Sequence, residues 1–124
     1  MKAQKKILIV DDDEDFLTLY GKKLVEFGFQ VAKATNSSEC EELMITEKPN
    51  LILLDISLGP EDGTELYNQL IEKGLDHGVP VIFLSALAEE MDVSKAHEGR
   101  KYALLSKGIK ISELIRQMEC MMKF

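Results

Sequence analysis

The chain has 124 residues, a length typical of one folded domain, and we expect residues 1–124 to form a single domain without an output domain. Hydrophobic residues make up 45% and charged residues 30% of the chain, an ordinary globular balance that excludes intrinsic disorder. The 22 acidic and 15 basic residues give a formal net charge of −7, which argues against a nucleic-acid binder or a basic membrane anchor. Solubility is the simplest explanation of this acidic excess.

Apolar runs and helix-spaced segments alternate along the chain. In chain order, the predicted elements are strand Lys6–Val10, helix Phe16–Phe27, strand Phe29–Ala32, helix Ser38–Glu47, strand Leu51–Leu54, helix Thr64–Ile71, strand Val81–Leu84, helix Glu89–Glu98, strand Tyr102–Leu105 and helix Ser112–Met122. Strands that are apolar at every position are typical of a parallel sheet covered by helices on both faces. The pattern therefore predicts an α/β fold of the doubly wound, flavodoxin-like class, with five parallel strands and five helices.

Capping residues mark the ends of several predicted helices. Ser38 has the spacing of a capping box, and Thr64 and Ser112 are further candidates for N-caps. Gly28 and Gly74 follow two helices at the position where a helix C-cap glycine belongs.

The first apolar run and the two cysteines indicate the cellular compartment of the protein. The run Ile7–Val10 is too short for a membrane span or the apolar region of a signal peptide. Cys40 and Cys120 lack metal-site spacing and predict free thiols. These features predict a cytoplasmic protein with no membrane partner.

Polar side chains follow four of the five predicted strands. Asp11–Asp13 follow the first strand, Asp55 the third, Ser85 the fourth and Lys107 the fifth. Because the carboxyl ends of parallel strands meet at one edge of a sheet, we expect these side chains to converge there.

Clustered carboxylates repel one another unless a cation or a proton neutralises them, and oxygen donors favour a hard divalent ion such as Mg²⁺. A lysine and a hydroxyl beside that ion would suit the three oxygens of a phosphoryl group, and an aspartate can act as its nucleophile. Each residue also has a simpler explanation. The run Asp11–Asp13 could cap a helix, Ser85 could lie in an ordinary turn, and Lys107 could be a surface lysine.

At this point the chain resembles the receiver domain of two-component response regulators, from Lys6 to about Met122. The resemblance rests on the matching residues Ile7–Asp12, Asp55, Asp62–Gly63, Ser85–Ala86 and Lys107. It implies the strand order 2-1-3-4-5 of the flavodoxin-like fold.

The resemblance also implies roles for the residues at the strand ends. It implies a Mg²⁺ or Mn²⁺ site formed by Asp11, Asp12, Asp55 and the backbone carbonyl of Ser57. Asp55 would accept a phosphoryl group from a histidine kinase or a histidine phosphotransfer protein. Ser85 and Lys107 would bind the phosphoryl oxygens.

The chain departs from the family pattern at three places. The loop after the phosphoacceptor reads Leu58-Gly59-Pro60 where Met-Pro-Gly is usual. Gly108 replaces the proline that normally follows the lysine, and Leu104 replaces the switch aromatic. Tyr102 lies two residues earlier, so it shares the strand face of Leu104.

The implied output is a contact with another protein, whose identity the sequence leaves unknown. We expect it at the face formed by helix Glu89–Glu98, strand Tyr102–Leu105 and the last helix, in a monomer or a phosphorylation-dependent dimer. Methionines adapt to varied partners, but we expect at least two of the last helix's methionines to pack on the sheet. They are Met118, Met121 and Met122.

Slow loss of the phosphoryl group is a further expectation. Ser57 and Leu87 occupy the positions that would flank the attacking water, and neither carries a carboxylate or an amide.

Three other functions compete with this interpretation. A pseudo-receiver that binds a partner without phosphorylation would keep the same fold. The Asp-x-Asp of Asp11–Asp13 resembles the motif of haloacid-dehalogenase-type phosphatases, but Asp15 stands where those enzymes have Thr or Val. A calcium loop starting at Asp11 would place Lys22 at its twelfth position, where Glu is required.

Overall fold

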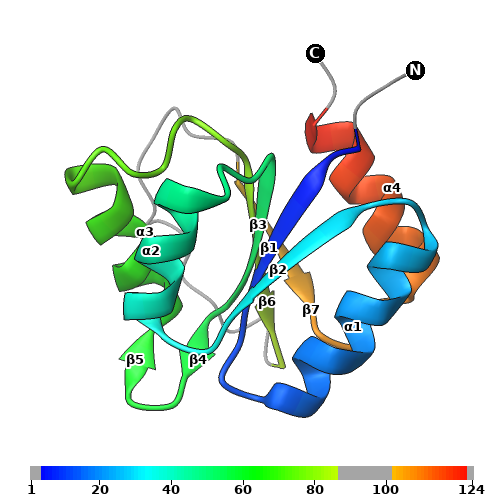
Figure 1. Ribbon diagram of the computed structural model, residues 1–124. Helices are drawn as coiled ribbons and strands as arrows, with labels where there is room; N and C mark the ends of the chain where they lie inside the picture. The colour runs from blue at the N-terminus through cyan, green and yellow to red at the C-terminus, as the bar shows by residue number, and fades with distance from the viewer. Residues whose placement is uncertain (1–3, 87–101, 123–124) are drawn as a thin grey trace.

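The computed structural model describes residues 4–86 and 102–122 (Figure 1). Its elements, in chain order, are β1 (Lys6–Val10), α1 (Glu14–Glu26), β2 (Gln30–Ala34), α2 (Ser37–Thr46), β3 (Leu51–Asp55), β4 (Ser57–Leu58), β5 (Glu61–Asp62), α3 (Gly63–Glu72), β6 (Val81–Ser85), β7 (Tyr102–Ser106) and α4 (Ile111–Met122). The predicted helix Glu89–Glu98 lies outside the described residues.

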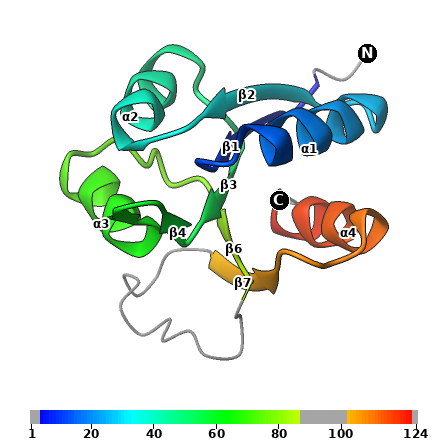
Figure 2. The same ribbon diagram turned by 90° about the horizontal axis from the view of Figure 1, so that it is seen from below.

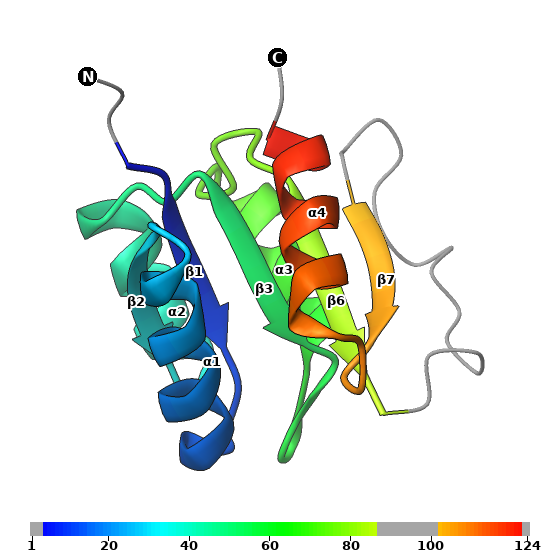
Figure 3. The ribbon, with the colours of Figure 1, turned by 90° about the vertical axis from the view of Figure 1, so that its right-hand side faces the viewer.

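The main sheet has five strands in the order β2-β1-β3-β6-β7, and every neighbouring pair is parallel. Counting only the strands of this sheet, that is the order 2-1-3-4-5, so the predicted flavodoxin-like α/β fold is confirmed. Figure 3 shows the strands running in one direction, with β7 at one edge. All five strands therefore end at the same side of the molecule.

Helices cover both faces of the sheet, as the apolar strands predict. Figure 2 shows α1 and α4 on one face and α2 and α3 on the other. Side chains alternate between these faces along β1, because Ile7 and Ile9 pack on the side of α1 and α4, while Leu8 and Val10 pack on the other side. Strands β3 and β6 alternate in the same way.

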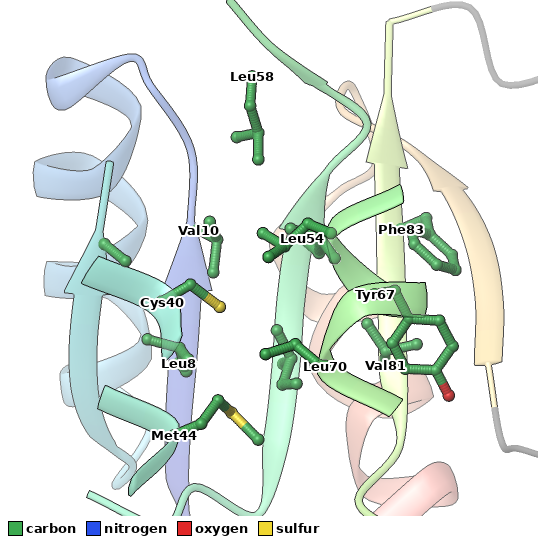
Figure 4. Packing of buried hydrophobic residues seen from close by; sticks show 13 residues of the cluster. Leu8, Val10, Cys40, Met44, Leu54, Leu58, Tyr67, Leu70, Val81 and Phe83 are labelled. Atoms are coloured by element: carbon green, nitrogen blue, oxygen red, sulfur yellow. The ribbon is translucent and has the colours of Figure 1, made fainter. Parts of the chain in front are cut away.

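Aliphatic side chains fill most of the core between the sheet and helices α2 and α3, together with two aromatic rings and two sulfur-bearing side chains (Figure 4). Tyr67 meets Phe83 edge to face, with ring centroids 5.6 Å apart. Phe83 in turn lies 6.4 Å from Tyr102 on the edge strand. Leu104 packs on this same cluster, so Tyr102 and Leu104 share a face as expected.

The predicted N-caps are wrong at all three helices. Asn36, not Ser38, caps α2 by accepting from the backbone N–H of Glu39. Asp62 caps α3 by accepting from the backbone N–H of Thr64, so Thr64 lies inside the helix. Ser112 lies inside α4, because the N–H of Leu114 already bonds to the carbonyl of Lys110. These helices begin one or two residues earlier than predicted.

The glycine signals give the correct helix ends. Gly28 and Gly74 directly follow the C-caps of α1 and α3 with positive φ values of 97° and 70°. The segment after β3 contains a short antiparallel hairpin of β4 and β5, which the sequence pattern did not predict. Gly59, with φ of 64°, lies in its turn.

Two of the three methionines of α4 pack into the core as predicted, because Met118 and Met122 are buried. Both cysteines are free thiols, which confirms that prediction. Among the described helices, none combines the length and the apolar character that a membrane crossing requires.

Candidate functional site

The polar residues predicted at the strand ends lie on one edge of the sheet. Asp11 follows β1, Asp55 ends β3, Ser85 ends β6 and Lys107 follows β7. Figure 1 shows these strand ends beside the hairpin of β4 and β5 and the start of α1. The parallel register therefore brings together residues that are far apart in the sequence.

Three carboxylates form the centre of the site. Asp11, Asp12 and Asp55 each offer an oxygen within 4.8 Å of the other two. Asp11 and Asp55 are buried, with 0% and 6% of their surface exposed, whereas Asp12 is exposed. A set of hard oxygen donors with one open side matches the preference of Mg²⁺ or Mn²⁺.

Asp13, the third acid of the run, has a different role. Its side chain caps α1 by accepting from the backbone N–H groups of Asp15 and Phe16. Its own N–H donates to Asp11 Oδ1 at 2.9 Å, which fixes the orientation of that carboxylate. The helix-cap explanation of the acidic run is therefore correct for Asp13, while Asp11 and Asp12 belong to the carboxylate cluster.

Lys107 supplies positive charge to the two buried carboxylates. Its Nζ lies 2.8 Å from Asp11 Oδ2 and 3.3 Å from Asp55 Oδ2. The pKa of Asp55 is raised to about 6, first by burial and then by the nearby Asp11, against the opposing effect of Lys107. Burial lowers the pKa of Lys107, but its contacts with Asp11 and Asp55 outweigh this and leave that pKa raised. Lys107 is thus no ordinary surface lysine.

Backbone hydrogen bonds hold the remaining predicted residues near Asp55. The N–H of Lys107 donates to the carbonyl of Ser85 at 2.9 Å, which links the ends of β6 and β7. Ser85 is buried, with 8% of its surface exposed. The N–H of Ser57 donates to Asp55 Oδ1 at 3.2 Å, and Ser57 itself is exposed. Ser57 therefore lies beside the Asp55 carboxylate.

Gly63 of the Asp-Gly pair packs directly on the chain around Asp55. Its N–H donates to the carbonyl of Ile56 at 2.7 Å. A Cβ atom at this position would lie 2.2 Å from the backbone oxygen of Asp55. Only glycine lets the start of α3 approach the end of β3 this closely.

Three residues that sequence reasoning missed also contact the site or its hairpin. The ring centroid of Phe16 lies 4.6 Å from Lys107 Nζ, and the hydroxyl of Tyr20 donates to the carbonyl of Lys107 at 3.4 Å. Glu61 accepts from the N–H and hydroxyl of Ser37 at 3.0 and 2.6 Å, which ties the hairpin to the start of α2. Glu61 lies 24 residues from Ser37, so no local sequence pattern could have found this contact.

Comparison with known proteins identifies relatives along most of the chain. The family model described as "Response regulator receiver domain" matches residues 7–119. The chain is 41% identical over 88 residues to the alkaline phosphatase synthesis transcriptional regulatory protein PhoP of Bacillus subtilis (strain 168), an alignment covering 71% of this chain and 36% of PhoP. It is 34% identical over 117 residues to an uncharacterized 14.6 kDa protein of Leptolyngbya boryana, covering 94% of this chain and 89% of that one.

Solved structures show the same fold. The BeF₃-activated N-terminal receiver domain of Klebsiella pneumoniae RstA superposes with a TM-score of 0.82 at 27% identity, covering 97% of this chain and 100% of that chain. A CheY-like receiver domain protein of Methanospirillum hungatei JF-1 also gives a TM-score of 0.82 at 27% identity, covering 97% of this chain and 94% of that chain. The family match, the relatives and the strand order agree: the chain belongs to the response regulator receiver domains of two-component signalling.

Proposed function

We propose that this receiver domain accepts a phosphoryl group on Asp55 and passes the signal on through contact with another protein. The observation that supports this most directly is the position of Asp55, a buried carboxylate whose Oδ2 lies 3.3 Å from Lys107 Nζ. Asp11 and Asp12 lie around the same point. The donor would be a histidine kinase or a histidine phosphotransfer protein, as the family membership implies.

The carboxylate cluster fits a resident Mg²⁺ or Mn²⁺ ion. Asp11, Asp12 and Asp55 would hold it, and the backbone carbonyl of Ser57 is the further ligand that the family resemblance implies. When bound, the ion supplies positive charge that offsets the carboxylates and the phosphoryl oxygens. Asp12 is the exposed member of the cluster, so the ion site would be open to solvent at Asp12.

The side chains of the site would have different roles in the phosphoryl transfer. A carboxylate oxygen of Asp55 forms the new bond to phosphorus while the bond from phosphorus to the donor nitrogen breaks, and the leaving imidazole keeps that electron pair and takes a proton. Asp55 must be ionised to react, and a pKa of about 6 leaves it mostly ionised at pH 7. Lys107 would neutralise charge on the phosphoryl oxygens, and the Ser85 hydroxyl would donate to them.

The competing function is a pseudo-receiver that binds a partner without phosphorylation. Incubation with Mg²⁺ and acetyl phosphate, followed by intact-mass spectrometry, distinguishes the two. We expect one added phosphoryl group on the unmodified chain, none on Asp55→Asn, and an undiminished adduct on Asp15→Asn, which changes an exposed acid on α1. An unmodified chain without an adduct would favour the pseudo-receiver.

Slow autodephosphorylation is a second prediction about Asp55. Ser57 lies beside the acceptor but offers no carboxylate or amide to orient an attacking water. Leu87, the other position in the prediction, lies outside the described residues. Decay of the phosphorylated mass in Mg²⁺ buffer would measure the lifetime, and a lifetime of only seconds would contradict the prediction.

The output contact is proposed for the edge of the sheet at β7. Tyr102 and Leu104 lie on this edge strand, and the expected helix Glu89–Glu98 lies outside the described residues. The alignment with PhoP covers 36% of that longer regulator. We propose a protein partner here, and no nucleic-acid or membrane contact, for a domain that is a monomer or dimerises on phosphorylation.

A further inference from the structure

Two stacked aromatic rings on α1 contact both ends of Lys107. Phe16 and Tyr20 lie one helical turn apart, with ring centroids 4.1 Å apart and planes inclined by 18°. The ammonium of Lys107 lies 4.6 Å from the centroid of Phe16, within the range of a cation–π interaction. The hydroxyl of Tyr20 donates to the backbone carbonyl of Lys107 at 3.4 Å. Helix α1 thus contacts both the side chain and the backbone of this lysine.

Lys107 needs such support because of its place in the fold. It follows β7, which lies at the edge of the sheet, and its side chain remains 25% exposed. Gly108 follows it, so no proline ring stiffens the turn. A long lysine side chain with solvent on one side has many rotamers available, and holding it at Asp55 costs conformational entropy.

The two carboxylates that attract Lys107 are also those that would hold the divalent cation. An ion bound to Asp11 and Asp55 would offset their charge and weaken their attraction for the ammonium. The face of a phenyl ring attracts a cation through its quadrupole and carries no net charge for that ion to neutralise. Neutralisation of the carboxylates therefore does not weaken the attraction between Lys107 and Phe16.

The start of α1 fixes the ring at this position. The side chain of Asp13 accepts from the backbone N–H of Phe16 at 3.3 Å, and the ring packs partly against the core beneath α1 and α4. Asp13 is joined through its own N–H to Asp11. The ring is thereby tied to the same short segment that carries two of the site's carboxylates.

We propose that Phe16 is a positioning residue that keeps the Lys107 ammonium beside Asp55 when a divalent cation occupies the carboxylates, with Tyr20 holding the backbone of Lys107. This inference rests on the proposed phosphorylation of Asp55 for its consequence, but the position of the lysine can be tested without phosphorylation.

The first experiment measures where Lys107 lies. Protons on the carbon next to Nζ should show an upfield ring-current shift in the NMR spectrum of the unmodified chain, with and without saturating Mg²⁺. The shift should disappear in Phe16→Leu, which keeps an apolar side chain, and return in Phe16→Tyr, which restores an aromatic face. Phe27→Leu is the matched control, because Phe27 is an exposed aromatic at the other end of α1. Loss of the shift when Mg²⁺ is added to the unmodified chain would overturn the inference.

The second experiment measures the consequence at the site. Beryllofluoride mimics a phosphoryl group on aspartate, and its affinity in Mg²⁺ should fall about two- to fivefold in Phe16→Leu, the loss expected for one partly exposed cation–π contact. Phe16→Tyr and Phe27→Leu should bind like the unmodified chain, and equal affinity in Phe16→Leu would overturn the inference. If the unmodified chain binds no beryllofluoride while the NMR shift behaves as expected, the proposed phosphorylation fails and the positioning of Lys107 by Phe16 stands.

Discussion

At the scale of single residues, the charged groups of the site lower the stability of the folded protein. Asp55 is buried beside the buried Asp11, and Lys107 is the cation that both carboxylates share. Two negative charges in a small volume cost free energy that one partly exposed lysine offsets only in part. The pKa of about 6 at Asp55 expresses that cost, because the folded protein holds this proton more tightly than the unfolded chain does.

The variant Asp55→Asn should therefore stabilise the metal-free protein at neutral pH. A carboxyl group whose pKa is raised on folding contributes full stability below its unfolded value of 3.8 and loses it as the pH rises through about 6. We expect the variant to be about 1–3 kcal/mol more stable at pH 7.5, with a gap that shrinks toward pH 4. Lys107 keeps its ion pair with Asp11 in this variant.

Urea unfolding in the presence of a chelator, at several pH values, measures this gap. Addition of Mg²⁺ should then stabilise the unmodified chain more than the variant, since the variant lacks one ligand. Equal stability of the two proteins at pH 7.5 without metal would contradict the prediction.

At the scale of elements, the close approach of α3 to the end of β3 depends on Gly63. Replacement by alanine would place a Cβ 2.2 Å from the backbone oxygen of Asp55, and backbone atoms cannot move aside as a flexible side chain can. We expect Gly63→Ala to lose at least about 2 kcal/mol of stability. Because the shift reaches Asp55, we also expect it to slow phosphorylation.

Gly108→Ala is the matched control near the same site. The nearest atom to its added Cβ would be Ser106 Oγ at 3.6 Å, an ordinary contact. Its stability should change by less than about 0.5 kcal/mol. Thermal unfolding of both variants tests the pair, and similar losses in the two would show that Gly63 is not specially constrained.

The elements also show what the sequence can and cannot predict. The positions of β1, β3 and β6 followed from apolar runs, because burial on both faces demands them, whereas the half-exposed β2 begins and ends later than predicted. The start of α2 did not, since Asn36, Ser37 and Ser38 are all good N-cap residues. Tertiary contacts decide among them: Glu61 takes the hydroxyl of Ser37, and Glu39 bonds the N–H and hydroxyl of Thr35 at 2.7 Å.

The site shows the same division. Asp11, Asp55 and Lys107 could be predicted because each lies at or directly after the end of a strand, and parallel strands end together. Phe16 could not be separated from the residues that line the buried side of α1, since its spacing from Tyr20 is the ordinary spacing of a core-facing helix. Its contact with Lys107 depends on how α1 packs across the sheet from β7, which no local pattern encodes.

At the scale of the whole molecule, the two cysteines lie in different environments, so their reactivity can measure how the core opens. Cys40 is fully buried between α2 and the sheet (Figure 4). Cys120 is exposed on α4. The pKa of the Cys40 thiol is raised to about 12, mainly by burial and to a lesser extent by the nearby Glu41. The reactive thiolate form of Cys40 is therefore scarce at neutral pH.

We expect one thiol to react rapidly with an aromatic disulfide reagent at pH 8 and the other at least about a thousandfold more slowly, because Cys40 must wait for unfolding. In Cys120→Ser the rapid phase should vanish, while the slow phase remains and accelerates with urea. Two rapid phases in the native protein would mean that the core beneath α2 opens more readily than its packing indicates.

The ion pairs of Lys107 also constrain the order in which the chain can fold. Lys107 lies 52 residues beyond Asp55, so both buried carboxylates leave the ribosome well before their counter-charge. A nascent chain that ends at β6 would have to bury Asp11 and Asp55 without a cation, which strongly opposes folding. The last strand and helix thus complete the charge balance as well as the core, and a divalent cation bound to Asp11 and Asp55 would replace the missing positive charge during synthesis.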